Sequence, residues 1–491
     1  MSNKMADKTL ELVKHDEDVF PVEGRRCTDV AFLFLILSTW ICVTFIGLSA
    51  MGVIHSEVIN QGNPKLLTHG VDYMGNICGV DSPVQHLSKK VYPNFDLTTV
   101  SSTSDYVPAL FAVCVESCPS AGDTITDPYG TYGSWVASDD SRDFLNACLF
   151  STESAGNTSL VTLLSDLAQT AMLIGLLGFV LACILSLCFL LIVRIPLLLR
   201  LVVWSCALLV QLLLSVGGLF FLYQSSQRNG GYSTLCHCST EVVLLKTVGG
   251  VLLVCAILWA SILGFWRSRI ALAISLVRES AAALTYMPLI CFLPLLQTAL
   301  YVGVTAVLLL YAVYLATSGQ VHTVTDSITG ISYSYLTLDV PTQRAMVLVC
   351  FTWLWSIGWL ESVGMVSSAH AVSAWYFAPH RREITSGQIL RSVGVVARYH
   401  AGSAAAGSLV ISLLRFLRVT VTYLTKVSAP PRGLRSEKSP LCLRCLHGML
   451  ACIQYCVQFF TKHAFIYVAI TGQSFFPAAG NAFLGLRRGS G

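Results

Sequence analysis

The sequence predicts an all-α, multi-pass membrane protein with a disulfide-containing loop domain after its first membrane helix. Of the 491 residues, 54% are hydrophobic and only 12% are charged, and long uncharged stretches recur along the chain. Soluble domains carry about 25% charged residues, so this chain has too little charge to cover a globular surface in water. The net charge of +4 does not indicate a nucleic-acid partner. The lipid bilayer is therefore the expected surroundings of most of the chain.

Six apolar stretches are long enough to cross a bilayer, which takes about 20 residues. They are residues 30–53, 170–193, 201–223, 247–266, 284–318 and 345–369. The fifth contains Pro288 and Pro294, and we expect it to tilt or kink because proline removes a helical hydrogen bond. Two weaker candidates, residues 398–424 and 445–472, carry charges. Each of these could be a span, a re-entrant segment or an amphipathic helix at the interface.

Basic residues near the span ends predict the orientation, because cytosolic loops carry an excess of Lys and Arg. Five Lys and Arg residues precede the first span, whereas the loop 317–343 has none. The N-terminus is therefore expected in the cytosol, and residues 1–21 are too polar for a signal peptide. The expected divisions are a cytosolic tail (1–29), a first span (30–53), an extracellular loop domain (55–167), a membrane core (170–424), a cytosolic basic loop (425–444) and a C-terminal membrane-associated segment (445–491).

The extracellular loop domain is polar and contains four cysteines, which are Cys78, Cys114, Cys118 and Cys148. An even number of cysteines in an extracellular segment predicts two disulfides, with three possible pairings. Cys236 and Cys238 in the next outer loop could form another. Asn157 begins the loop domain's Asn-X-Ser/Thr sequence and is the expected glycosylation site.

No motif indicates an enzyme, a metal or a cofactor. Phosphate-binding, zinc-protease and hydrolase signatures are missing from the sequence, so neither ATP-driven transport nor catalysis by this chain is expected. Cysteines at 442, 445, 452 and 456 have a spacing that resembles a metal site. Their surroundings favour an amphipathic helix in which they pack or are acylated.

Glu361 stands inside an otherwise apolar span, where a carboxylate is costly unless it faces a cavity, a partner or a substrate cation. Aromatic faces attract quaternary ammonium groups. Trp353, Tyr286 and Tyr301 are therefore the candidates to form a cation or proton site with Glu361. The alternative is a protonated Glu361 bonded to a neighbouring helix, with the aromatic residues packing or anchoring the helices at the interface.

Seven short segments occur in an order that resembles the choline transporter-like family. They are RRCTDV (25–30), VDYMGNICG (71–79), CVESCP (114–119), RIALAISLVRESAAALTYMP (269–288), SAWYFA (373–378), RYHAGSAAAGS (398–408) and HAFIYVAITGQSFF (463–476). The similarity runs from about residue 25 to residue 486, which is most of the chain. Seven segments in one order are specific, although each is short.

The resemblance implies an ATP-independent carrier of choline, and of ethanolamine, in the plasma membrane or an organelle membrane. It also implies about ten spans, cytosolic termini, independence from sodium, and proton exchange as the coupling. Relatives continue beyond the last segment with two further helices, so the C-terminal part of this chain is expected to be shortened. A scaffold or receptor that uses the loop domain without transporting a solute is the alternative.

Overall fold

A computed structural model describes residues 24–92, 111–137, 140–144, 146–150, 158–229, 239–325, 330, 332–378, 380, 385, 387–427 and 441–489. Within them the chain divides into two compact units. The first unit comprises Met1–Ala171, Cys291–Pro379 and Gly387–Gly491, and the second comprises Met172–Ile290 and His380–Ser386. Each unit is described by itself.

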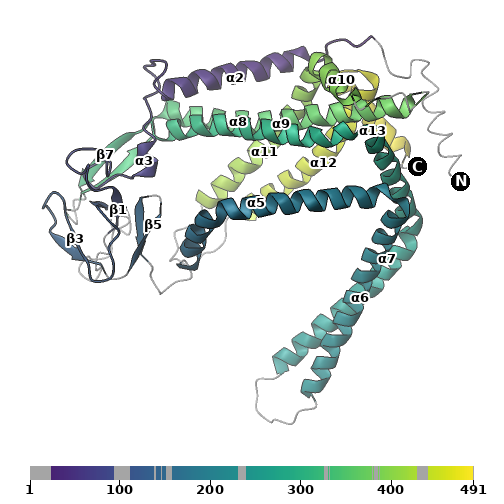
Figure 1. Ribbon diagram of the computed structural model, residues 1–491, viewed down its shortest axis with the longest axis horizontal. Helices are drawn as coiled ribbons and strands as arrows, with labels where there is room; N and C mark the ends of the chain where they lie inside the picture. Colours follow the sequence, from purple (N-terminus) through teal and green to yellow (C-terminus); the bar gives the residue numbers. More distant parts are fainter. Residues whose placement is uncertain are drawn as a thin grey trace. The chain divides into compact units, whose positions relative to one another are not determined.

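The first unit is built around helix α9 (Val340–Phe377), which packs against neighbours from both ends of the sequence. In Figure 1, α9 runs beside α8 (Leu293–Ala316), and α2 (Val30–Ala50) lies along both. The C-terminal helices α11 (Ala401–Val427) and α12 (Leu441–Thr471) also pack on α9. Three further helical segments complete this unit: α10 (Gln388–Val395), the π-helical turn η4 (Val396–His400) and α13 (Phe475–Gly489).

Apolar side chains fill the spaces between these helices. One cluster joins Val43 of α2 to Leu308 of α8 and Val349 of α9. Another joins α9 to α11 through Trp355 and Ala405, which are almost completely buried. The many apolar side chains that remain exposed on these helices suit contact with lipid rather than water.

The fifth predicted span is interrupted at its prolines, as expected. A 3-10 segment, η2 (Pro288–Phe292), precedes α8, and α8 carries Pro294 at its N-terminus. Proline is tolerated there because the first amide groups of a helix have no partner within it. The helical segment is thus interrupted where the sequence predicted a tilt or a kink.

The second unit is a pair of antiparallel helices together with most of α5 (Thr158–Arg194). Helix α6 (Pro196–Asn229) packs along α7 (Ser239–Tyr286), as Figure 1 shows. Gly218 and Gly249 bring the two backbones together, since a Cβ on either would lie within 3.2 Å of the other helix. The amphipathic segment that begins at residue 269 continues α7 without a break, because no Gly or Pro occurs between Trp266 and Tyr286.

Six helices are long and apolar enough to cross a membrane, counted among the described residues. They are Val30–Ala50, Leu197–Gln227, Val242–Tyr286, Pro288–Ala316, Val340–Phe377 and Gln388–Leu424. Five match predicted spans, and the sixth belongs to the weaker candidate at 398–424. The predicted span 170–193 lies within α5, whose described apolar part, Met172–Ser186, is shorter. The predicted class, a mostly helical multi-pass membrane protein, is confirmed.

A small β region follows α2 and the short helix α3 (Lys65–Thr68). Its main sheet has the strand order β2-β1-β6-β5, and β3 pairs with β4. The strands are β1 (Lys89–Val91), β2 (Val113–Val115), β3 (Thr124–Thr126), β4 (Ser134–Val136), β5 (Ser141–Phe144) and β6 (Ala147–Phe150). Disulfides join Cys78 to Cys114 and Cys118 to Cys148, which is one of the three pairings that the sequence allowed. Asn157, Cys236 and Cys238 lie outside the described residues.

A hairpin between α8 and α9 holds this β region in place. It consists of β7 (Gln320–Thr325) and β8 (Ser332–Thr337). The Ser334 hydroxyl donates to the carbonyl of Tyr73 over 2.8 Å. The Tyr132 hydroxyl donates to the carbonyl of Gly330 and accepts from the amide of Ser332. The loop domain is thereby joined to two membrane helices far along the sequence.

Candidate functional site

Glu361 lies at a small cavity between α9, α11 and α12. Its carboxylate oxygen Oε2 is 3.6 Å from Nη2 of Arg415 on α11. The cavity has a volume of about 70 Å³ and is lined by Gly358, Glu361, Ser362, Met365, Ile411, Arg415, Gln458, Thr461, Lys462 and Phe465. Binding pockets for drug-sized ligands usually measure about 300–1,000 Å³. The cavity in this conformation therefore has room for water but not for a sizeable solute.

Small residues and indole groups bring α9 and α11 close together beside this cavity. A Cβ on Gly358 would lie 3.0 Å from the hydroxyl oxygen of Ser412, and that hydroxyl donates to the carbonyl of Leu354. The indoles of Trp355 and Trp359 donate to the carbonyls of Ala405 and Ala401. Trp355 and Trp359 thus pack α9 against α11.

Of the aromatic candidates, Tyr301 is the one with an electrostatic interaction with Glu361, although it does not line the cavity. Tyr301 hydrogen-bonds to Gln297 and interacts electrostatically with Glu361 and Arg415. Gln297, one turn earlier on α8, donates its amide to the carbonyl of Leu360 over 2.8 Å. Glu361 therefore has polar neighbours on both α8 and α11.

The other two aromatic candidates occupy different surroundings. The indole of Trp353 donates to the hydroxyl of Thr305 over 3.1 Å, and Trp353 is not among the residues that line the cavity. Tyr286 ends α7 in the second unit.

Arg415 and Lys462 are site residues that the sequence did not single out. Both belong to the two weaker span candidates, where their charges argued against a simple membrane helix. The available signal was the occurrence of opposite charges in separate apolar segments, because a carboxylate in lipid usually faces such a partner. Which segments meet depends on tertiary packing, so the pairing itself could not be predicted.

The N-terminal segment before α2 is fixed to the ends of the C-terminal helices. Arg25 donates to Nε2 of His400 over 3.0 Å and to the carbonyl of Ala469 over 2.8 Å. Asp29 accepts from the Ser403 hydroxyl and from the amide of Phe475, both at 2.7 Å. Burial lowers the pKa of the Arg25 guanidinium, which remains charged because arginine normally titrates above about 12. The start of α2, η4 and the end of α12 thus meet at one end of the first unit.

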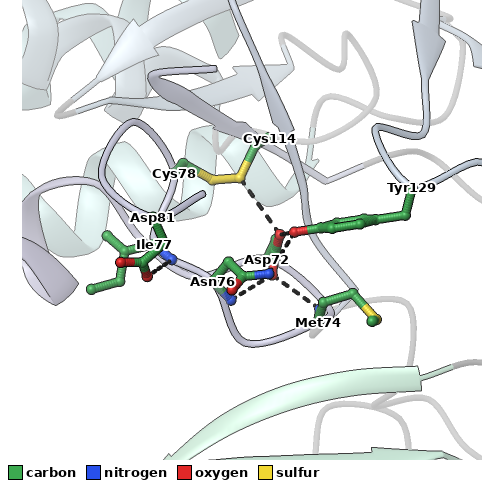
Figure 2. The surroundings of a disulfide bond; sticks show 8 residues. All are labelled: Asp72, Met74, Asn76, Ile77, Cys78, Asp81, Cys114 and Tyr129. Carbon is green, nitrogen blue, oxygen red and sulfur yellow. Dashed lines mark hydrogen bonds between the residues drawn. A yellow bond between two sulfur atoms is a disulfide. The ribbon is translucent and has the colours of Figure 1, made fainter. Parts of the chain in front are cut away.

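A buried carboxylate organises the turn beside the first disulfide (Figure 2). Asp72 accepts from the amides of Met74 and Asn76, at 3.0 and 2.8 Å, and from the Tyr129 hydroxyl. Burial raises the pKa of Asp72, and these hydrogen bonds oppose the rise. Burial also raises the pKa of the Tyr129 phenol, so Tyr129 stays a donor at neutral pH. The hydrogen bonds of Asp72 thus fix the turn beside the Cys78–Cys114 disulfide.

The structure shows no metal site among the residues it describes. No group of three or more His, Cys, Asp or Glu side chains there is arranged to hold an ion. Cys445, Cys452 and Cys456 are exposed and unpaired.

Comparison with known proteins connects this architecture to a family. A sequence profile described as "Plasma-membrane choline transporter" matches residues 250–490. That range contains α8, α9, α11 and α12, and so includes every residue of the Glu361 cavity. The chain belongs to the choline transporter-like family.

Relatives extend the similarity to the rest of the chain. Choline transporter-like protein 2 of Dictyostelium discoideum is 25% identical over 94% of this chain and 78% of its own length. Choline transporter-like protein 2 of Salmo salar is 23% identical over 95% of this chain and 80% of its own length. Choline transporter-like protein 1 of Caenorhabditis elegans is 28% identical in an alignment that covers 46% of this chain and 31% of that protein. The choline transporter-like family is a transporter family rather than an enzyme family.

Proposed function

We propose that this choline transporter-like protein carries choline, or a related small organic cation such as ethanolamine, across a membrane without ATP. The observation that carries the proposal is the similarity over 94% of the chain to a protein named as choline transporter-like. The six apolar helices supply the membrane-spanning framework that a carrier needs.

Glu361 is the residue that we assign to the cation. Its carboxylate is the negative group at a cavity whose other charged lining residues are Arg415 and Lys462. A cation that approaches Glu361 has to compete with Arg415 for the carboxylate. The described conformation, with the ion pair formed and little free volume, corresponds to a site without its cation. Displacement of Arg415 would open the cavity and expose the charge that binds the substrate.

Proton exchange is the coupling that we propose, with the plasma membrane as the location and the N-terminus in the cytosol. A proton on Glu361 would neutralise the carboxylate and release the bound cation. Cation and proton would then occupy the same group in turn, which is the simplest exchange that one carboxylate supports.

Uptake by the purified protein tests the proposal. Proteoliposomes without ATP are expected to accumulate labelled choline above the level of protein-free vesicles, with ethanolamine competing. A pH gradient that is acidic inside should increase the initial rate. Vesicles that contain folded protein but take up no more choline than empty vesicles would contradict the assigned function.

A receptor or scaffold role for the loop domain is the second candidate, favoured by its two disulfides. The hydrogen bonds from the β7–β8 hairpin to Tyr73 and Tyr132 join this domain to α8 and α9. They argue for a part of the transport unit rather than an independent binding module. Tight binding of a protein ligand without solute flux would favour the second candidate.

A further inference from the structure

A second and larger cavity lies along α11 and α12, farther from the N-terminal segment than the Glu361 cavity. Its volume is about 620 Å³, and it is lined by Leu354, Arg415, Arg418, Val419, Thr422, Tyr423, His447 and Gln454. Arg415 lines both cavities. The larger one has no role in the transport mechanism proposed above.

The lining of this cavity carries an excess of positive charge. Arg415 and Arg418 are one helical turn apart, and no acidic residue lines the cavity. Glu361 of the neighbouring cavity is 3.6 Å from Arg415. Arg418 donates through Nε to Nε2 of His447 over 3.2 Å. Because arginine does not lose its proton, Nε2 of His447 is the acceptor. Among the described residues, Arg415 therefore has a carboxylate partner, whereas the side chain of Arg418 is bonded to the imidazole of His447.

The position of these arginines along α11 places them toward the far side of the membrane. Gly402 is level with the start of α2, since a Cβ on it would touch the backbone of Thr28 and Asp29. Arg415 and Arg418 stand thirteen and sixteen positions later, or about 20 and 24 Å along a helix that rises 1.5 Å per residue. The hydrocarbon core is about 30 Å thick, so Arg418 approaches the opposite layer of lipid headgroups.

We infer that this cavity binds the phosphate group of a membrane phospholipid. An uncompensated guanidinium in this region is costly, whereas a guanidinium and a phosphate form paired, charge-assisted hydrogen bonds. Arg415 and Arg418 hold the phosphate. Val419 and Tyr423, which are 50% and 66% exposed, lie on the same part of α11 and provide apolar surface for the glycerol backbone and acyl chains.

Gln454 indicates the kind of headgroup. Its Oε1 atom is buried and accepts no hydrogen bond from the described residues. A headgroup with an N–H or O–H donor, such as ethanolamine, fills this position, whereas the trimethylammonium group of phosphatidylcholine has no donor. The site thus recognises a phosphate group and a hydrogen-bond donor next to it. Lipid binding can be measured without measuring choline transport.

Native mass spectrometry of the delipidated full chain tests the assignment. We expect phosphatidylethanolamine to remain bound at least ten-fold more tightly than a diacylglycerol with the same acyl chains. Arg418→Gln should weaken phosphatidylethanolamine binding by at least ten-fold. Arg344→Gln, which removes an exposed arginine from the start of α9, is the matched control and should bind like the wild type.

Several results would overturn the assignment. These are equal retention of diacylglycerol, undiminished binding by Arg418→Gln, or binding of inorganic phosphate alone as tightly as the lipid, which would assign the arginines to a free phosphate. If Arg418→Gln does not fold, a photoactivatable phosphatidylethanolamine is applied to the wild type. Cross-links within 413–424 or 446–456 support the site, and cross-links only elsewhere contradict it.

Discussion

The ion pair between Glu361 and Arg415 changes how the acidic residue is understood. From the sequence, Glu361 was either a cation site or a protonated side chain bonded to another helix. The structure pairs it with the guanidinium of Arg415, 3.6 Å away. A structural role for Glu361 now means neutralising Arg415, and this role makes a different prediction from cation binding.

Two variants separate these roles. Glu361→Gln should raise the KM for choline about ten-fold, which corresponds to the loss of about 1.4 kcal/mol of binding. The double variant Glu361→Gln/Arg415→Gln removes both charges of the ion pair, so neither partner is left as an unpaired charge. If Glu361 binds the cation, the double variant keeps the raised KM; recovery of wild-type uptake would show that the carboxylate serves only Arg415. Glu116→Gln, at an exposed position in the loop domain, is the control for initial-rate measurements.

Gly402 lets the N-terminal segment approach α11 closely. A Cβ there would overlap the carbonyl oxygens of Thr28 and Asp29, and the backbone has little freedom to move away. Gly402→Ala should reduce the free energy of unfolding by about 1–3 kcal/mol, measured as a lower melting temperature in detergent. Gly394→Ala adds a Cβ that meets nothing within 4 Å and should not lower it. Equal melting of both variants would contradict the close contact.

At the scale of elements, composition and periodicity predicted most helices because each apolar stretch can be judged by itself. The irregularity at the prolines near the start of α8 and the two disulfides of the loop domain could also be predicted, because they follow from the residue types themselves. Helix α7 extends to Tyr286, well beyond the predicted span 247–266, because the end of an apolar stretch does not mark the end of a helix. The docking of β7–β8 on Tyr73 and Tyr132 could not be foreseen, because it depends on surfaces far apart in the sequence.

Whether α11 and α12 cross the membrane decides the topology of the C-terminal region. Residues 425–444 were expected in the cytosol with the tail, and 428–440 lie outside the described residues. Arg25 contacts His400 and Ala469, so the start of α11 and the end of α12 lie beside the tail. If α11 spans the membrane, as its length and hydropathy allow, the connection lies on the opposite side.

A cysteine at Ser436 tests this topology in a variant whose exposed cysteines, including Cys445, are replaced by serine. We expect a membrane-impermeant maleimide to label it on intact cells, because a spanning α11 exposes the connection to the outside. Labelling only after permeabilisation would show that α11 is re-entrant and that residues 425–444 are cytosolic. A cysteine at Ser334 in the hairpin is the control for the outer side.

For the molecule as a whole, the sequence predicted the class and the family better than the site. Apolar stretches and ordered motifs are properties of the chain, whereas a site depends on which helices meet. Glu361 could be singled out because a carboxylate is rare in an apolar span. Arg415 and Lys462, which lie at the same cavity, could not be singled out. Trp353, a candidate from the same helix as Glu361, contacts Thr305 instead.

Counterflow tests the central claim, that this chain is a carrier, most directly. Proteoliposomes loaded with unlabelled choline are diluted into a trace of labelled choline, with no ATP and no ion gradient. A carrier exchanges the two pools, so we expect a transient accumulation of label above its equilibrium level. Protein-free vesicles and vesicles loaded with buffer alone should show none. Labelled choline that never rises above equilibrium in vesicles containing folded protein would contradict the account.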